Sequence, residues 1–190
     1  IYNDIATLPA NNFRIVFRDV ARATDYRTLI PCLIPPGRFI QNTGISIYFK
    51  KGDDFEMLYI LGIMSSRVLD WFSKHFVELH LNFFIFNFFR VPNPSQNDLL
   101  RLRVIEIAGM LACVDNSFND FASRINMERR LINNEEKENL MCELDAVSAI
   151  LYGLSRDEFI HIYKTFHLSW NFQDSLDISL IHFDSWSKKV

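Results

Sequence analysis

The acidic, histidine and cysteine side chains of this sequence do not form a specific catalytic or metal-binding pattern. Glu135 and Lys137 have the spacing of a nuclease Glu-x-Lys element, but they lie in a polar helical interval without a strand, which favours a solvated surface. His161 and His167 flank an apolar stripe, and no carboxylate or cysteine is spaced to complete a metal set with them. We therefore expect no catalysis by this chain and no bound metal.

Glycine and proline motifs for cofactor chemistry are also missing. The 6 glycines occur singly, without the glycine-rich turn that S-adenosylmethionine would need. The segment Asn93-Pro94-Ser95-Gln96 departs at two places from the Asn/Asp-Pro-Pro-aromatic signature of amino-methyltransferases. No Gly-x-Ser-x-Gly elbow is present, although a Ser-His-Asp arrangement assembled in space stays open. The sequence therefore predicts no cofactor in this chain.

Composition predicts a folded chain without a membrane span. Among 190 residues, 49% are apolar and 18 are Phe, which favours a well-packed core. No apolar run reaches the roughly 18 residues that a membrane span needs. Three widely spaced cysteines favour free thiols in a reducing cytoplasm. The start Ile-Tyr-Asn-Asp, without Met or a leader, suggests a piece of a longer protein.

Charge is divided unevenly along the chain. The net formal charge is -3, but residues 1–103 carry a net of +3 and residues 104–190 a net of -6. A surplus of three positive charges is modest. It does not by itself predict a nucleic-acid partner.

The first part of the chain is expected to combine short strands with one long helix. Alternating apolar residues predict strands over 13–20, 28–34 and 45–50. In the first strand, one face packs and the other shows arginines. Asp53 and Glu56 have capping-box spacing before a helix over 54–77, in which Gly62 would allow close approach of a neighbour. Residues 83–89 are expected to form a buried strand or an adjoining extended segment.

The second part is expected to be helical. Apolar stripes begin after the capping signals Ser95 with Asp98 and Ser155 with Glu158, and residues 178–183 could form a short strand. The expected fold class is α+β. Its expected parts are a mixed lobe over 1–95, followed by a helical support or docking part over 96–190.

An ordered series of motifs in the first part resembles one family. The series is Arg18-Asp19, Thr24, Arg27-Thr28-Leu29-Ile30, Pro35-Pro36-Gly37, Asp70-Trp71, His80-Leu81-Asn82-Phe83-Phe84 and Val91-Pro92. It is similar to the C-terminal target-recognition (specificity) region of type IIG restriction-modification methyltransferase-endonucleases. The resemblance covers roughly residues 14–94, with a weaker similarity at 144–146 and 151–154.

The resemblance implies a module that reads double-stranded DNA beside the methyltransferase core of a parent chain. That parent would methylate adenine with S-adenosylmethionine and cleave with Mg. Forked side chains would meet base edges, and Lys or Arg would hold phosphates. The implied DNA-binding residues are Arg14, Arg18, Arg22, Arg27, Thr28, Lys50, Lys51, Arg67, Lys74, His80 and Asn82.

Several of these residues have a structural alternative. Four motif residues are expected either to hold a loop through an internal ion pair or to touch phosphates: Arg18, Asp19, Arg27 and Thr28. His80 and Asn82 could equally satisfy backbone groups at a junction. Two other functions also stay open: a helical protein-interaction module, and a free-standing specificity subunit serving separate catalytic chains.

Overall fold

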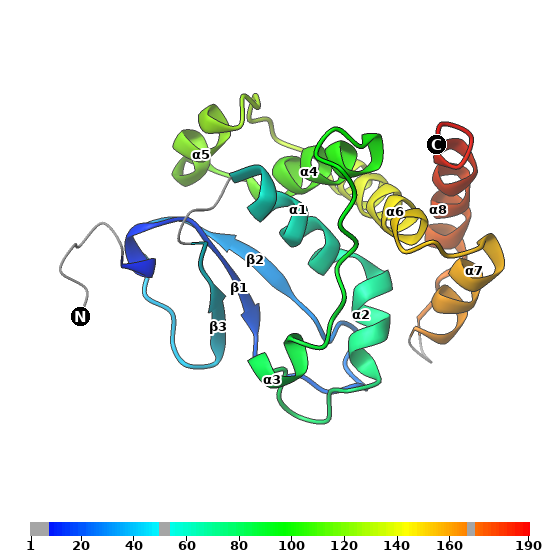
Figure 1. Ribbon diagram of the computed structural model, residues 1–190, viewed down its shortest axis with the longest axis horizontal. Helices are drawn as coiled ribbons and strands as arrows, with labels where there is room; N and C mark the ends of the chain where they lie inside the picture. The colour runs from blue at the N-terminus through cyan, green and yellow to red at the C-terminus, as the bar shows by residue number, and fades with distance from the viewer. Residues whose placement is uncertain (1–7, 50–53, 167–169) are drawn as a thin grey trace.

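The computed structural model describes residues 8–49, 54–166 and 170–190 (Figure 1). A small antiparallel sheet lies on one side of a group of helices, which confirms the expected α+β class. The strands are β1 (Arg14–Arg18), β2 (Pro31–Ile34) and β3 (Gly44–Ile47), in the order β2-β1-β3. Each falls within or beside an expected strand but is shorter. A 3-10 turn, η2 (Pro9–Asn11), precedes the sheet.

Strand β1 is covered on both faces, unlike the half-exposed strand expected from its alternating sequence. Residues 14–17 are all buried. Arg14 is only 3% exposed, and its guanidinium donates to the carbonyls of Pro9, Asn12 and Arg38 at 3.2, 3.3 and 2.5 Å. Three carbonyl acceptors allow a buried arginine to keep its hydrogen bonds. The expectation that Arg14 lies on an exposed face was wrong.

The long helix expected over 54–77 is two helices, α1 (Asp54–Ser65) and α2 (Arg67–Lys74). Ser66 separates them because its backbone is extended, with φ -70° and ψ 147°, and its hydroxyl accepts from the N–H of Leu69. Asp53, the expected first residue of a capping box, lies outside the described residues.

Residues 83–89 do not form the expected buried strand. Residues 83–86 form a short helix, α3 (Phe83–Phe86), which begins because the Asn82 side chain accepts from the N–H of Ile85 at 3.1 Å. Phe84 is 73% exposed, so the aromatic run belongs partly to the surface. An aromatic sequence therefore does not by itself indicate a buried segment.

The second part is helical, as expected, in the residues that the structure describes. Its elements are α4 (Leu99–Ala112), the 3-10 turn η3 (Asn116–Phe118), α5 (Asn119–Arg124), α6 (Asn134–Leu151), α7 (Arg156–Thr165) and α8 (Gln173–Trp186). The capping box of Ser155 and Glu158 is confirmed. At α4 the N-cap is Asp98 and not the expected Ser95, because the Asp98 carboxylate accepts from the N–H groups of Leu100 and Arg101. The strand expected at 178–183 is wrong, since these residues lie within α8.

One hydrophobic core joins the sheet, α1, α4 and α6, so it contains residues from both sides of Ser95. A second cluster packs α7 and α8 against α6 and includes Val68 of α2. Gly62 brings α1 close to α4, because a Cβ at that position would lie 2.5 Å from a Val104 methyl. Among the described residues, no helix is both long and apolar enough to cross a membrane.

Candidate nucleic-acid interface

Asp70 of α2 anchors the loop that joins β1 to β2, residues 19–30, here called the β1–β2 loop. Its side chain is fully buried. One carboxylate oxygen accepts from the N–H groups of Thr28 and Leu29, at 3.0 and 2.7 Å. The other lies 2.5 Å from Arg27 Nε, in an ion pair that lacks hydrogen-bond geometry. A buried carboxylate needs such partners, so the end of the loop is fixed to the helix.

Two further cations bind the loop's own acceptors. Arg18 Nη2 donates to Asp25 Oδ2 at 2.7 Å and to the carbonyl of Arg27 at 2.8 Å. Lys74 Nζ donates to the carbonyls of Ala23 and Asp25. Partial burial lowers the pKa of Lys74. Arg18, Arg27 and Lys74 therefore order the loop, as the internal ion-pair alternative for Arg18 and Arg27 anticipated.

Arg22 is the candidate that this loop presents to solvent. The buried Thr28 hydroxyl donates to the carbonyl of Arg22 at 2.9 Å, and the N–H of Arg22 donates to Asp25 Oδ2 at 3.2 Å. These contacts fix its backbone. The Arg22 side chain is exposed, and it forms no ion pair with any residue that the structure describes. A fixed backbone with a free guanidinium suits contact with an anionic surface.

The segment that carries His80 and Asn82 lies beside the start of the loop. The N–H of Leu81 donates to the carbonyl of Asp19 at 2.7 Å, and His80 Nδ1 lies 3.0 Å from Asp19 Oδ2. Val20 and His80 form an isolated antiparallel bridge. Asn82 caps α3, so the backbone-satisfying alternative describes its contact in this structure. Both side chains remain on an exposed segment.

Arg67 is not on this surface. Its Nη1 lies 2.5 Å from Asp145 Oδ2 in the buried space between α2 and α6, and its N–H donates to Asp145 Oδ1 at 2.6 Å. Tyr163 donates to the same carboxylate at 2.9 Å and lies 2.6 Å from Ser179 Oγ. Burial raises the pKa of Tyr163, which keeps it a neutral donor. Because the Arg67 side chain is buried, it is not accessible for the predicted contact with DNA.

The structure thus separates the candidates by position. Around the β1–β2 loop it brings together Arg18, Arg22, Arg27, Thr28, Lys74, His80 and Asn82. Arg14 and Arg67 are buried elsewhere, whereas Lys50 and Lys51 lie outside the described residues.

Asp70 and Asp145 are structural anchors that were not among the candidates. The available signal for Asp70 was its place in the apolar run Val68 to Phe72. A lone acid in such a run is buried only when it is paired. Its arginine partner is distant in sequence, so the pairing itself could not be read from the chain.

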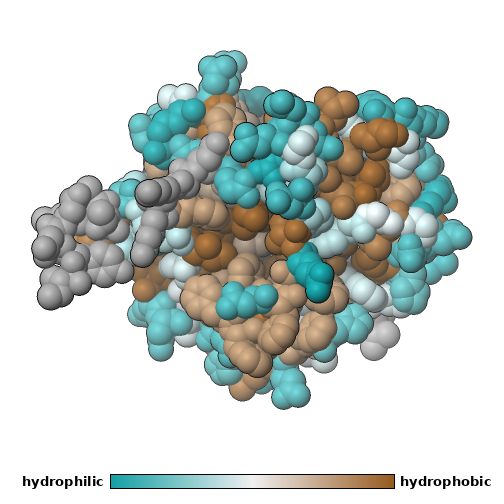
Figure 2. All heavy atoms as spheres, in the orientation of Figure 1, coloured by the Kyte–Doolittle hydropathy of each residue, from teal (hydrophilic) through white to brown (hydrophobic). Residues whose placement is uncertain are grey.

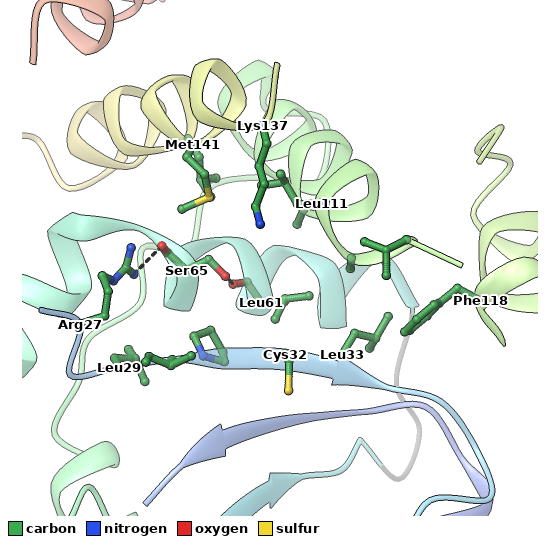
Figure 3. A pocket seen from close by; sticks show the side chains of 16 residues that line it. Arg27, Leu29, Cys32, Leu33, Leu61, Ser65, Leu111, Phe118, Lys137 and Met141 are labelled. Carbon is green, nitrogen blue, oxygen red and sulfur yellow. Dashed lines mark hydrogen bonds between the residues drawn. The ribbon is translucent and has the colours of Figure 1, made fainter. Parts of the chain in front are cut away.

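An apolar cleft of about 460 Å³ lies between β2 and helices α1, α4 and α6 (Figure 3). Arg27 stands at one end, where its Nη2 donates to the carbonyl of Ser65 at 2.7 Å, and Lys137 reaches down from α6. Among the described residues, no acid or histidine lines the cleft. Its ionisable lining side chains are Arg27, Cys32 and Lys137.

Within the described residues, no group of three or more His, Cys, Asp or Glu side chains is placed to hold a metal ion. Comparison of the chain with protein-family models, with curated proteins and with solved structures finds no match. The features that bear on function are therefore the motif series and the geometry of the β1–β2 loop.

Proposed function

We propose that this chain is a sequence-specific duplex DNA recognition module of a restriction-modification enzyme. It positions a target site for adenine methylation and cleavage by other parts of the parent enzyme. S-adenosylmethionine and Mg would be bound by those parts. The partners would be double-stranded DNA and the methyltransferase core.

The observation that carries the proposal is the gathering of Arg18, Arg22, Arg27, Lys74 and His80 around one loop. Inward cations hold this loop in shape, while Arg22 faces solvent. A pre-shaped loop loses little conformational entropy when it binds. An exposed arginine on such a loop can hold a phosphate or a base edge with defined register.

Replacing Arg22 by Ala tests this proposal. We expect duplex affinity to fall about tenfold, the value of a charge-assisted hydrogen bond of about 1.5 kcal/mol. If the contact is to phosphate, the slope of log K against log salt should shrink by about one. Fluorescence anisotropy with a labelled duplex of mixed sequence, between about 50 and 200 mM salt, measures both quantities.

The matched control is Lys188→Ala, which removes one exposed cation near the C-terminus. It should leave both affinity and salt slope unchanged. If the two substitutions lowered duplex affinity equally, binding would depend on the overall charge of the chain and not on the position of Arg22. No duplex binding by the unmodified chain would remove the proposal in favour of a protein-interaction module.

A further inference from the structure

A second, smaller pocket of about 300 Å³ lies between α2, the segment after α3, and the end of α6 with α7. Its lining is almost entirely aromatic and aliphatic. The lining residues are Val68, Leu69, Trp71, Phe72, Phe88, Arg90, Tyr152, Leu154 and Ile162. We call it the aromatic pocket. Its volume is at the lower end of the roughly 300–1,000 Å³ that small-ligand sites occupy.

The pocket opens beside an exposed aromatic surface. Phe88 on its rim is 61% exposed and pairs with Phe84 at a ring-centre distance of 5.3 Å. Phe72 pairs with the exposed Phe76 at 4.9 Å. Figure 2 shows apolar side chains gathered over α3 and its surroundings. Exposed apolar patches of this kind are found at binding sites more often than elsewhere on a protein surface.

Arg90 is the one charged residue in the lining that the structure describes, and it sits on the rim with an exposed side chain. The Tyr152 hydroxyl donates to its carbonyl at 2.8 Å, which fixes the backbone there. Burial raises the pKa of Tyr152, so this donor stays neutral. No described residue forms an ion pair with Arg90. The pocket thus combines aromatic walls with one available cation.

We propose that the aromatic pocket receives one unstacked base of a DNA strand, with the neighbouring phosphate held by Arg90. Bases stack on aromatic side chains, and arginine holds the strand's backbone. Besides Arg90, the hydrogen-bonding side chains of the described lining are Trp71 and Tyr152. Both already donate within the protein, to Thr165 Oγ1 and to the Arg90 carbonyl, so neither is available to read a base edge. Capture is therefore tolerant of base identity. The ligand class rests on the proposed DNA-binding function.

A single-stranded probe tests the pocket directly. We expect a labelled 12-nucleotide oligothymidine to bind and to quench the emission of Trp71, which is one of 3 tryptophans. The quenching should disappear in Trp71→Phe. Phe88→Ala should weaken binding roughly five- to a hundredfold, the range measured for loss of one base–aromatic stack. Arg90→Gln should weaken it and reduce the salt dependence.

The matched control is Phe39→Ala, because Phe39 is 89% exposed and does not line the pocket. An abasic strand with the same phosphates serves as the control ligand, and its binding should be weak. The pocket proposal is overturned if the abasic strand binds as well as oligothymidine. It is also overturned if Phe88→Ala and Phe39→Ala change the affinity for oligothymidine equally. That result would be expected if the pocket received a protein side chain and no base.

The two proposals fail separately. Loss of duplex affinity in Arg22→Ala, with oligothymidine binding unaffected by Phe88→Ala, retains the duplex function and removes the base pocket. Loss of oligothymidine binding in Phe88→Ala, with duplex affinity unaffected by Arg22→Ala, retains the pocket and removes the role of the loop.

Discussion

At the scale of single residues, the role of an arginine or lysine depends on whether its side chain points into the protein or into solvent. The sequence does not contain that information. Arg18 and Arg22 are four positions apart, yet one binds the loop's own acceptors and the other faces solvent. Their chemistry is identical. The motif series therefore selected candidate residues, but the division between loop-ordering and solvent-facing side chains required the fold.

Asp70→Asn should test the anchor of the β1–β2 loop. The substitution keeps the size of the side chain but leaves Arg27 without its counter-charge. We expect the free energy of unfolding to fall by about 3 kcal/mol, the lower end for breaking a buried pair, because Arg27 is partly exposed. Urea denaturation followed by circular dichroism measures this change.

The control for this prediction is Asp184→Asn, which breaks the exposed ion pair with Arg156. A surface pair of this kind contributes at most about 1 kcal/mol. A loss of stability in Asp70→Asn no larger than in Asp184→Asn would show that the loop is held by other contacts.

At the scale of helices and strands, the sequence predicted some local features correctly and missed others. The capping box of Ser155 and Glu158 and the close approach at Gly62 were both predicted and are both present. Two helix starts were among the boundaries that it missed. Ser66 ends one helix and caps the next within one apolar stripe, and Asn82 starts a helix in an aromatic run that resembles a buried strand.

Glu143 connects three helices and should make stability depend on pH. It accepts from Arg103 of α4 at 2.8 and 2.6 Å and from the Trp186 indole of α8 at 2.9 Å. Burial alone would raise its pKa, but these donors lower it below the ordinary 4.5. The stabilisation is therefore fully present above about pH 4.5 and is lost as pH falls through the lowered pKa.

Glu143→Gln should accordingly be less stable than the unmodified chain at pH 7, by about 2 kcal/mol for charge-assisted hydrogen bonds. The difference should narrow as the pH is lowered below 4.5. Thermal unfolding of both proteins between pH 7 and pH 3 measures it. A difference that stays constant over this range would contradict the role of the ionised carboxylate.

At the scale of the whole molecule, the sequence indicated the class and the order of the two parts but not their shared interior. Strand residues such as Ile15 and helix residues such as Val104 and Leu144 belong to the same core. Contacts between positions so far apart in sequence leave no local pattern. The boundary at residue 95 therefore marks a change of composition within one packed interior.

This shared core predicts a single cooperative unfolding transition. Residues 1–95 alone would expose the apolar side of α1, so we expect that fragment not to fold. Urea denaturation of the whole chain, followed by circular dichroism and by tryptophan emission, should give coincident curves. A cooperative transition of the fragment 1–95 in the same experiment would show instead that the first part is an independent domain.

Helix α2 binds in two directions through residues only three positions apart. Arg67 is fastened to Asp145 of α6, and Asp70 is fastened to the β1–β2 loop. In mechanical terms the helix is a short strut, held to α6 at its start by Arg67 and to the loop by Asp70 and, at its end, by Lys74. We therefore expect a rotation of α6 to shift the β1–β2 loop in the same direction.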